Sequence, residues 1–478
     1  MSNFAPEPYV PAEMRLGDSE AFLVGIQNRK QQKITPSSGT AGPFRFEGTN
    51  QIEFQWTHGD GSDLSTTVLY FKWTPVTESN GDTLDAKGSL SMASDVIDKV
   101  EFSIDGTEVL NSNSRVLSVV QNILMMSEYN DDYFHREGSI LMGHSSQKVN
   151  PSHNTSTGTA FVANELRNSK SRVYAVPLWA IHVGFSQQEI CPLLGSTIRM
   201  VFHLNQPAKV LNTRTSVTSS YKLENVYLME DRLMFTPNYK DALMARVQSQ
   251  EGFKIHYVDY EITSQNINNA DTQSLVVRNE HSNSSTLILF NEYDNLYRAD
   301  VSGVAVVADL EVPSYPSFDV DIAKRTENLR VECGTLSFTG LNGSSSLVEH
   351  FVHVERANGT LGLPNSTGCY DWDLYAGDTV GYLPKRLNKN PNINPDLNGV
   401  VNFSPLIVSL EKTLTPDTDT NIVNRGLSGL DPGSSRDIDV YLKYHTNQKL
   451  DKTKERLVSV LVYEKTLVMA NGTIEVQH

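Results

Sequence analysis

The sequence predicts an all-β protein of two tandem antiparallel β-sandwiches or jelly rolls, with a few short helices and long loops. Three observations support this prediction. The chain of 478 residues exceeds the roughly 250–300 residues at which a single core stops growing. Apolar and polar residues alternate along most of the sequence, as in half-buried antiparallel strands. Helical periodicity is scarce, and no repeat of roughly 20–50 residues indicates a propeller or a solenoid.

The best-defined strands have apolar residues at alternate positions, which therefore share one face of a sheet. They contain Ile52, Phe54 and Trp56; Leu69, Phe71 and Trp73; Val100, Phe102 and Ile104; Ile198, Met200, Phe202 and Leu204; and Ile438, Val440, Leu442 and Tyr444. Asp105-Gly106 directly follows the third of these strands and favours a tight turn. Asn471-Gly472 separates the last two apolar segments and predicts a carboxy-terminal hairpin.

Two segments have helical patterns. One follows Asn113 and Ser114, which are good N-cap residues, and its apolar stripe continues to about Tyr129. The other is a shorter segment at 240–247 in the middle of the chain. Long polar stretches at about 130–170 and 340–400 predict loops with a function, because loops longer than about 15 residues are uncommon in compact domains.

The mid-chain helix divides the sequence into two strand-rich halves of similar length. The predicted organisation is an extended N-terminal arm at 1–44, a first jelly roll at 45–238, a linker helix at 239–249 and a second jelly roll at 250–478. Pro6, Pro8 and Pro11 disfavour regular structure at the start of the arm. We therefore expect the arm to be dispensable for folding and to contact neighbouring subunits.

Charge and composition exclude several classes of function. The chain has 40 Lys and Arg against 56 Asp and Glu, a net charge of −16, which disfavours a protein that coats nucleic acid. Neither a secretory signal nor an apolar segment of the roughly 20 residues needed to span a membrane is apparent. Cys191, Cys333 and Cys369 are odd in number and scattered, which predicts inert thiols in a reducing environment rather than disulfides.

The sequence contains none of the common nucleotide-binding, serine-hydrolase or zinc-protease motifs, and no pair of carboxylates indicates a glycosidase. Two clusters are candidates for metal binding. His350 and His353 have a suitable spacing for a helix, but the surrounding valines predict a strand, on which these positions point to opposite faces. We therefore predict no catalytic residues, no cofactor and no bound metal.

The second candidate cluster is acidic. Asp371, Asp373 and Asp378 are residues that hard cations prefer as ligands. The segment departs from a calcium-binding EF-hand loop, because Tyr375 and Ala376 stand where a ligand and the glycine belong. We interpret it as a solvated loop.

Polar triplets and one basic segment have simple structural interpretations. Arg29-Lys30-Gln31-Gln32-Lys33 is too short for a nucleic-acid-binding tail, and we interpret it as part of a solvated arm that can touch an acidic neighbour. Asn-x-Ser/Thr triplets are interpreted as turn and loop residues because no secretory signal precedes them. They begin at Asn154, Asn283, Asn342, Asn358, Asn365, Asn402 and Asn471.

Several segments, taken in order, resemble a known family. They are Phe54-Gln55-Trp56, Leu69-Tyr70-Phe71, 100–104, Val176-Pro177-Leu178-Trp179, Gly184-Phe185, 191–194, Ile198-Arg199-Met200, 221–228, 298–316, 427–431 and 458–476. Together they resemble the double jelly-roll major capsid proteins of the adenovirus–tectivirus lineage. The greatest similarity is to the capsid proteins of Polinton-like viruses, adintoviruses and virophages.

The resemblance extends over most of residues 45–478 and implies assembly rather than catalysis. It implies a major capsid protein of a DNA virus, in which three chains form a pseudo-hexameric homotrimeric capsomer that tiles an icosahedral shell, with the long loops as outward towers. The implied location is the virion, after assembly inside the host cell. The implied partners are further copies of the chain, penton and minor capsid proteins and, in some viruses, an internal membrane, without sequence-specific nucleic-acid binding.

An alternative from another class stays open at this point. A carbohydrate-binding or spike-like adhesive protein could also be built from two β-sandwiches. Mass in solution separates the two hypotheses, because a capsid protein should trimerise and then polymerise.

Overall fold

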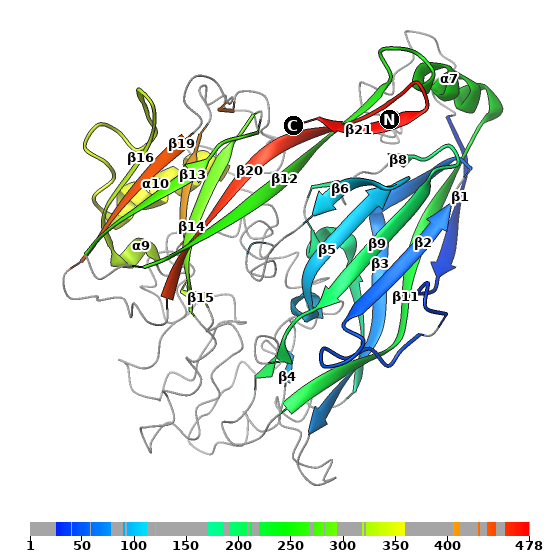
Figure 1. The fold of residues 1–478 in the computed structure, drawn as a ribbon, viewed down its shortest axis with the longest axis horizontal. Coiled ribbons are helices and arrows are strands. Elements are labelled where there is room, and N and C mark those ends of the chain that lie inside the picture. Colours follow the sequence, from blue (N-terminus) through cyan, green and yellow to red (C-terminus); the bar gives the residue numbers. More distant parts are fainter. Residues whose placement is uncertain are drawn as a thin grey trace, which may run out of the picture.

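The computed structural model describes residues 25–39, 41–57, 59–77, 89–90, 93–111, 120, 171–182, 184–185, 191–207, 211–212, 219–267, 271–281, 283–293, 318–319, 322–358, 405–410, 429–430, 437–445 and 455–477. These residues form two β-rich lobes that stand side by side and are joined by the helix α7 (Pro237–Val247) (Figure 1). We call the part before α7 the first lobe and the part after it the second lobe. The helix predicted at 240–247 is thus confirmed.

The described strands of the first lobe form two main antiparallel sheets and one short two-stranded sheet. One sheet has the strand order β1-β11-β3-β7 and the other the order β2-β9-β5-β6. The main strands are β1 (Ile26–Ile34), β2 (Gln51–Thr57), β3 (Gly61–Thr77), β5 (Ile97–Ile104), β6 (Thr107–Asn111), β7 (Arg172–Pro177), β9 (Thr197–Leu204) and β11 (Ser219–Phe235). Shorter elements are β4 (Ser89–Leu90), η4 (Ala93–Val96), α5 (Leu178–Ile181), β8 (Cys191–Pro192) and β10 (Leu211–Asn212).

The second lobe repeats this arrangement. β12, β20 and β14 are neighbours in one sheet, in which β18 also pairs with β14, and the other sheet has the order β13-β19-β16-β17. The main strands are β12 (Phe253–Asn266), β13 (Thr272–Arg278), β14 (Thr286–Tyr293), β16 (Thr326–Cys333), β17 (Leu336–Ser337), β18 (Leu406–Ser409), β19 (Asp437–Tyr444) and β20 (Glu455–Ala470). The remaining elements are β15 (Phe318–Asp319), α9 (Ile322–Arg325), α10 (Leu347–Asn358) and β21 (Thr473–Gln477).

The pairing order identifies each lobe as a jelly roll. We number the eight main described strands of each lobe in chain order. In one sheet the order of neighbouring strands is then first, eighth, third and sixth. In the other sheet the order is second, seventh, fourth and fifth. Both lobes follow this scheme, which is the double-sheet arrangement of a jelly roll. The predicted all-β class with two tandem jelly rolls is therefore confirmed.

The strand β1 revises the predicted start of the first lobe. The sequence assigns residues 1–44 to an arm, but β1 pairs with β11 from Ile26 opposite Phe235 to Ile34 opposite Leu228. It occupies the same place in the first lobe as β12 does in the second. Five consecutive residues of this edge strand are exposed, so no alternating pattern marks it in the sequence.

Alternating apolar residues fill the space between the sheets, as predicted. In β2, Phe54 is fully buried and meets Phe202 of β9 edge-on, with 6.0 Å between ring centroids. Among the described residues, Trp73 is the largest fully buried side chain, and it lies on the same face of β3 as Leu69. Burying a large apolar side chain stabilises a fold by roughly 1.5–3 kcal/mol, so these rows of residues hold each sandwich together.

The two predicted tight turns are confirmed by backbone conformation. Asp105 and Gly106 connect β5 and β6 with φ angles of 49° and 84°. Asn471 and Gly472 connect β20 and β21 with φ angles of 51° and 73°. Positive φ at both central residues is typical of the type I′ turns that join antiparallel strands.

The two stretches predicted to be long loops fall in equivalent connections of the two lobes. The connection from β6 to β7 contains the stretch 130–170, and the connection from β17 to β18 contains the stretch 340–400. Part of the latter stretch is helical, since α10 lies within it. The segments 130–170, 298–316 and most of 113–129 lie outside the described residues. In the part of the chain that the structure describes, no helix is both long and apolar enough to cross a membrane.

Candidate functional site

His350 and His353 lie on the helix α10, so the prediction of a strand here is wrong. Ser346 and Glu349 explain the helix, because they form a capping box. The Oγ of Ser346 accepts a hydrogen bond from the backbone N–H of Glu349 at 3.3 Å, and the Glu349 carboxylate accepts one from the Ser346 N–H at 3.1 Å. The Ser-x-x-Glu spacing is visible in the sequence and would have indicated a helix start.

The helical spacing does not make these histidines a metal site. His350 is 1% exposed, and its Nδ1 and Nε2 lie 2.8 Å from Ser344 Oγ and 3.3 Å from the Thr326 carbonyl oxygen. Both ring nitrogens therefore have protein partners. His353 is also buried, and burial lowers its pKa to about 4. Among the described residues, no group of three His, Cys, Asp or Glu side chains is placed to hold a metal ion.

Ser344 and His350 together resemble a nucleophile and its base, but their position excludes that role. Ser344 is 2% exposed, so no substrate can reach its hydroxyl group. The His350 Nε2 faces a backbone carbonyl rather than a carboxylate that would orient the ring for catalysis. The pair therefore fixes the turn before α10 against β16.

The two described cysteines are buried free thiols, as predicted. Cys191 is fully buried in β8, and burial, with a smaller effect from the negative charge of Glu230, raises the pKa of its thiol to about 12. Cys333 ends β16 and is also buried. A thiol with a raised pKa is a poor nucleophile. Cys369 and the acidic cluster at 371–378 lie outside the described residues.

The basic segment of the predicted arm belongs to β1 and does contact acidic neighbours. The guanidinium group of Arg29 lies 2.8 Å from Asp63 and 2.6 Å from Asp231. The ammonium group of Lys33 lies over the ring of Tyr227, 4.0 Å from its centroid. These contacts tie the edge strand to β3 and β11, so the interpretation of this segment as a solvated arm is wrong.

The described Asn-x-Ser/Thr positions occupy turns and ends of elements. Asn283 and Asn471 have positive φ angles of 51° in tight turns, and Asn358 ends α10. Asn342 is exposed next to Gly343, whose φ is 75°. This agrees with their interpretation as turn residues. Asn154, Asn365 and Asn402 lie outside the described residues.

The outer face of the β2-β9-β5-β6 sheet carries pairs of polar side chains across neighbouring strands. Arg199 of β9 lies 2.8 Å from Glu53 of β2. On the other side of β9, His203 lies 3.1 Å from Glu101 of β5. A hydrogen bond from Lys99 lowers the pKa of Glu101, against the effect of burial. This face is therefore polar.

The outer face of the β13-β19-β16-β17 sheet has the same character. Lys443 of β19 lies 2.6 Å from Glu327 of β16, and the Arg330 guanidinium lies over the Tyr441 ring at 5.7 Å from its centroid. Tyr441 and Val276 are exposed by 41% and 52% of their surface. Each lobe thus has an outer sheet face with exposed polar and aromatic side chains.

Comparison with known proteins shows similarity in structure but not in sequence. No protein-family profile and no curated protein sequence matches the chain. The Sputnik virophage structure matches with a TM-score of 0.56 at 12% identity, over 98% of this chain and 92% of that one. PBCV-1 VP54, fitted into a reconstruction of the virophage Sputnik, matches with a TM-score of 0.55 at 10% identity, over 94% of this chain and 97% of that one.

The Faustovirus major capsid protein matches with a TM-score of 0.50 at 10% identity, over 95% of this chain and 92% of that one. All three matches span both lobes. The chain has the double jelly-roll fold. The strand order agrees with this conclusion, because both lobes of the chain have the same jelly-roll pairing scheme.

Proposed function

We propose that this double jelly-roll protein is the major capsid protein of a DNA virus and that it forms pseudo-hexameric homotrimers that tile an icosahedral shell. The observation that supports this most strongly is the match over nearly the whole chain to structures of viral capsids and capsid proteins. Both lobes of this chain take part in that match, so the similarity extends beyond a single jelly roll.

The repeated lobe explains why three copies suffice. Each chain supplies two bodies with the same strand order, so three chains around a threefold axis place six similar bodies in a ring. Such a ring can meet six neighbours through nearly equivalent contacts. The exposed outer sheet faces would supply surface for these contacts.

The proposed partners follow from this role. They are other copies of the chain in the virion, together with penton and minor capsid proteins, and an internal membrane in viruses that have one. We propose no enzymatic activity. The described histidine and cysteine candidates support this, because all of them are buried and His350 also has a structural hydrogen-bond partner.

Light scattering of the purified protein tests the proposal. We expect a particle of three times the 53.2 kDa chain mass at both micromolar and nanomolar concentrations, because stable homo-oligomers usually bury well over about 1,000 Å². Electron microscopy should then show shells or sheets of six-lobed units. A monomer at both concentrations that binds a glycan would contradict the proposal and favour the adhesive alternative.

A further inference from the structure

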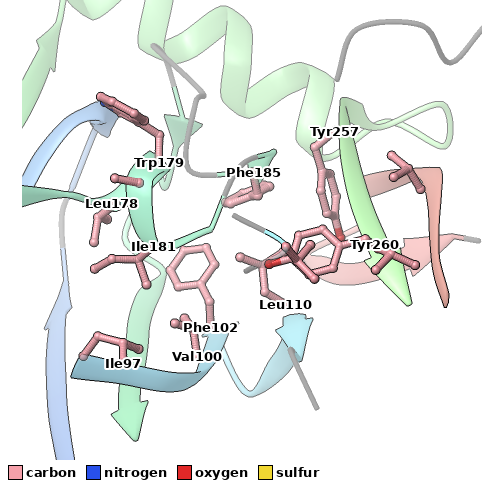
Figure 2. Close-up of a cluster of buried hydrophobic side chains, with 14 of the residues drawn as sticks. Ile97, Val100, Phe102, Leu110, Leu178, Trp179, Ile181, Phe185, Tyr257 and Tyr260 are labelled. Atoms are coloured by element: carbon pink, nitrogen blue, oxygen red, sulfur yellow. The ribbon is translucent and has the colours of Figure 1, made fainter. Parts of the chain in front are cut away.

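The two lobes meet where a short segment after α5 lies against β12. His182 stacks on Tyr260, with 4.6 Å between ring centroids and 14° between ring planes. Phe185 meets Tyr257 edge-on at 4.9 Å. Figure 2 shows Phe185 and Phe102 of the first lobe facing the two tyrosines of the second lobe, in one apolar cluster.

Gly184 brings the two backbones into direct contact. Its φ is 117°, a conformation that side-chain-bearing residues rarely adopt. A Cβ atom added at Gly184 would overlap the carbonyl oxygen of Val258. Only glycine therefore fits between α5 and β12 at this separation. The residues His182, Gly184 and Phe185, which we call the latch, thus contact Tyr260, Val258 and Tyr257 in reverse order.

A buried carboxylate, that of Asp259, also takes part in the contact between the latch and β12. The Asp259 carboxylate lies 3.3 Å from His182 Nε2 and 2.7 Å from the ammonium group of Lys465 on β20. It also accepts a hydrogen bond from the backbone N–H of Tyr260 at 2.8 Å. Burial opposes ionisation of Asp259, but His182 and Lys465 outweigh it and lower its pKa. Because an unpaired buried carboxylate is costly, the group favours one docked position of the lobes.

Other described contacts between the lobes lie close to the latch. The Tyr257 hydroxyl donates a hydrogen bond to the Val109 carbonyl at 3.0 Å. The Thr107 hydroxyl donates one to the Ile474 carbonyl at 3.1 Å, which links β6 to β21. The covalent connection between the lobes runs separately, through α7.

We propose that the latch sets the angle between the two jelly rolls, and that breaking it lets the lobes turn relative to each other while each lobe stays folded. Its consequence for assembly rests on the proposed function, since a closed ring of six lobes needs the same angle in every chain. The latch itself is a property of the single chain and can be tested without assembly.

The test substitutes Gly184→Ala and measures the distance between spin labels at Gln55→Cys and Ser274→Cys, which are exposed positions on different lobes. We expect the distance distribution to become at least about twofold broader than in the otherwise unchanged chain, with an unchanged circular dichroism spectrum. Gly195→Ala is the matched control. Gly195 has a similar φ of 99° in the same lobe, but an added Cβ would meet nothing within 4 Å.

A folded Gly184→Ala variant whose distribution matches that of Gly195→Ala would overturn the proposal. If Gly184→Ala does not fold, His182→Ala replaces it, because this change removes the stack on Tyr260 without adding atoms. Its control is His281→Ala, which removes a similar stack on Tyr463 within the second lobe alone. The proposal requires that His182→Ala broadens the distribution of label distances and that His281→Ala does not. Equal distributions for the two variants would refute it.

Particle formation is measured separately. If the wild type assembles, the latch variant should form at least about tenfold fewer particles than its control, and equal yields would refute the consequence for assembly. If the wild type does not assemble, the proposed function fails, but the label distances still decide whether the latch fixes the angle.

Discussion

At the tip of the β20–β21 hairpin, backbone conformation limits which side chains are tolerated. Gly472 has a φ of 73°, and a Cβ there would meet nothing within 4 Å, so any penalty for substitution arises from the backbone and not from crowding. We expect Gly472→Val to destabilise the protein by roughly 1–3 kcal/mol, since β-branched residues resist positive φ. Thermal unfolding measures this.

Asn471→Gly is the control at the neighbouring position. Its φ of 51° also suits glycine, so this substitution should change stability only slightly. Equal melting temperatures of Gly472→Val and the wild type would mean that the turn adapts without strain.

His353 should make stability depend on pH. Burial, assisted by the positive charge of Arg356, lowers its pKa to about 4, below the value of about 6.5 expected in the unfolded chain. The neutral form is therefore favoured in the folded state. Its contribution is fully present above about pH 6.5 and is lost as the pH falls toward 4. Between pH 7 and pH 5 this loss is about 1–2 kcal/mol.

We expect His353→Leu to reduce the fall in the free energy of unfolding between pH 7 and pH 5 by that amount. Urea unfolding at the two pH values is the measurement. His445→Gln, at an exposed position, should leave the fall nearly unchanged. A variant at 353 with the full wild-type pH dependence would show that another group is responsible.

Among the elements, β1 shows that part of the amino-terminal segment belongs to the folded body. It pairs along β11, and its last residue, Ile34, is buried. Deletion of residues 1–36 should therefore destabilise the chain by about 3 kcal/mol or more, through loss of buried area and of backbone hydrogen bonds. Deletion of residues 1–24 should leave the melting temperature close to that of the full chain.

Differential scanning calorimetry of the two truncated chains distinguishes these outcomes. The shorter deletion is the matched control, because it leaves every described residue in place. If both deletions melt alike, β1 contributes nothing to stability and the original prediction of a dispensable arm at 1–44 would be restored.

For the whole molecule, the net charge of −16 per chain should control assembly. Like charges on neighbouring capsomers repel each other, and salt screens this repulsion, with a Debye length of about 10 Å at 0.1 M. We therefore expect particle formation to increase as the salt concentration rises from about 0.05 to 0.5 M. Light scattering over a salt series checks this.

A series with sucrose in place of salt is the control, because sucrose does not screen charge. A decrease in assembly with salt would contradict the expectation. It would indicate that attractive ion pairs across the sheet faces, from residues such as Arg199 or Lys443, outweigh the overall repulsion.

Local patterns in the sequence determined most individual elements. Alternating residues such as Leu69, Phe71 and Trp73 marked the strands because burial on one face of a sheet has a period of two. Asp105-Gly106 and Asn471-Gly472 marked turns because few residues accept positive φ. The same logic failed for β1, where residues 27–31 are all exposed, and for α10, where valines around His350 and His353 fit two periodicities.

The tertiary structure alone decided which elements pair and how the two lobes meet. Ile34 pairs with Leu228, and His182 and Phe185 pack on β12, across long stretches of intervening chain. No local pattern encodes such contacts, because they depend on the combined shape of many packed side chains. The sequence by itself therefore determined that this is a two-part β protein. The position of β1, the jelly-roll strand order and the need for glycine at Gly184 became visible only in the folded chain, where distant backbones come into contact.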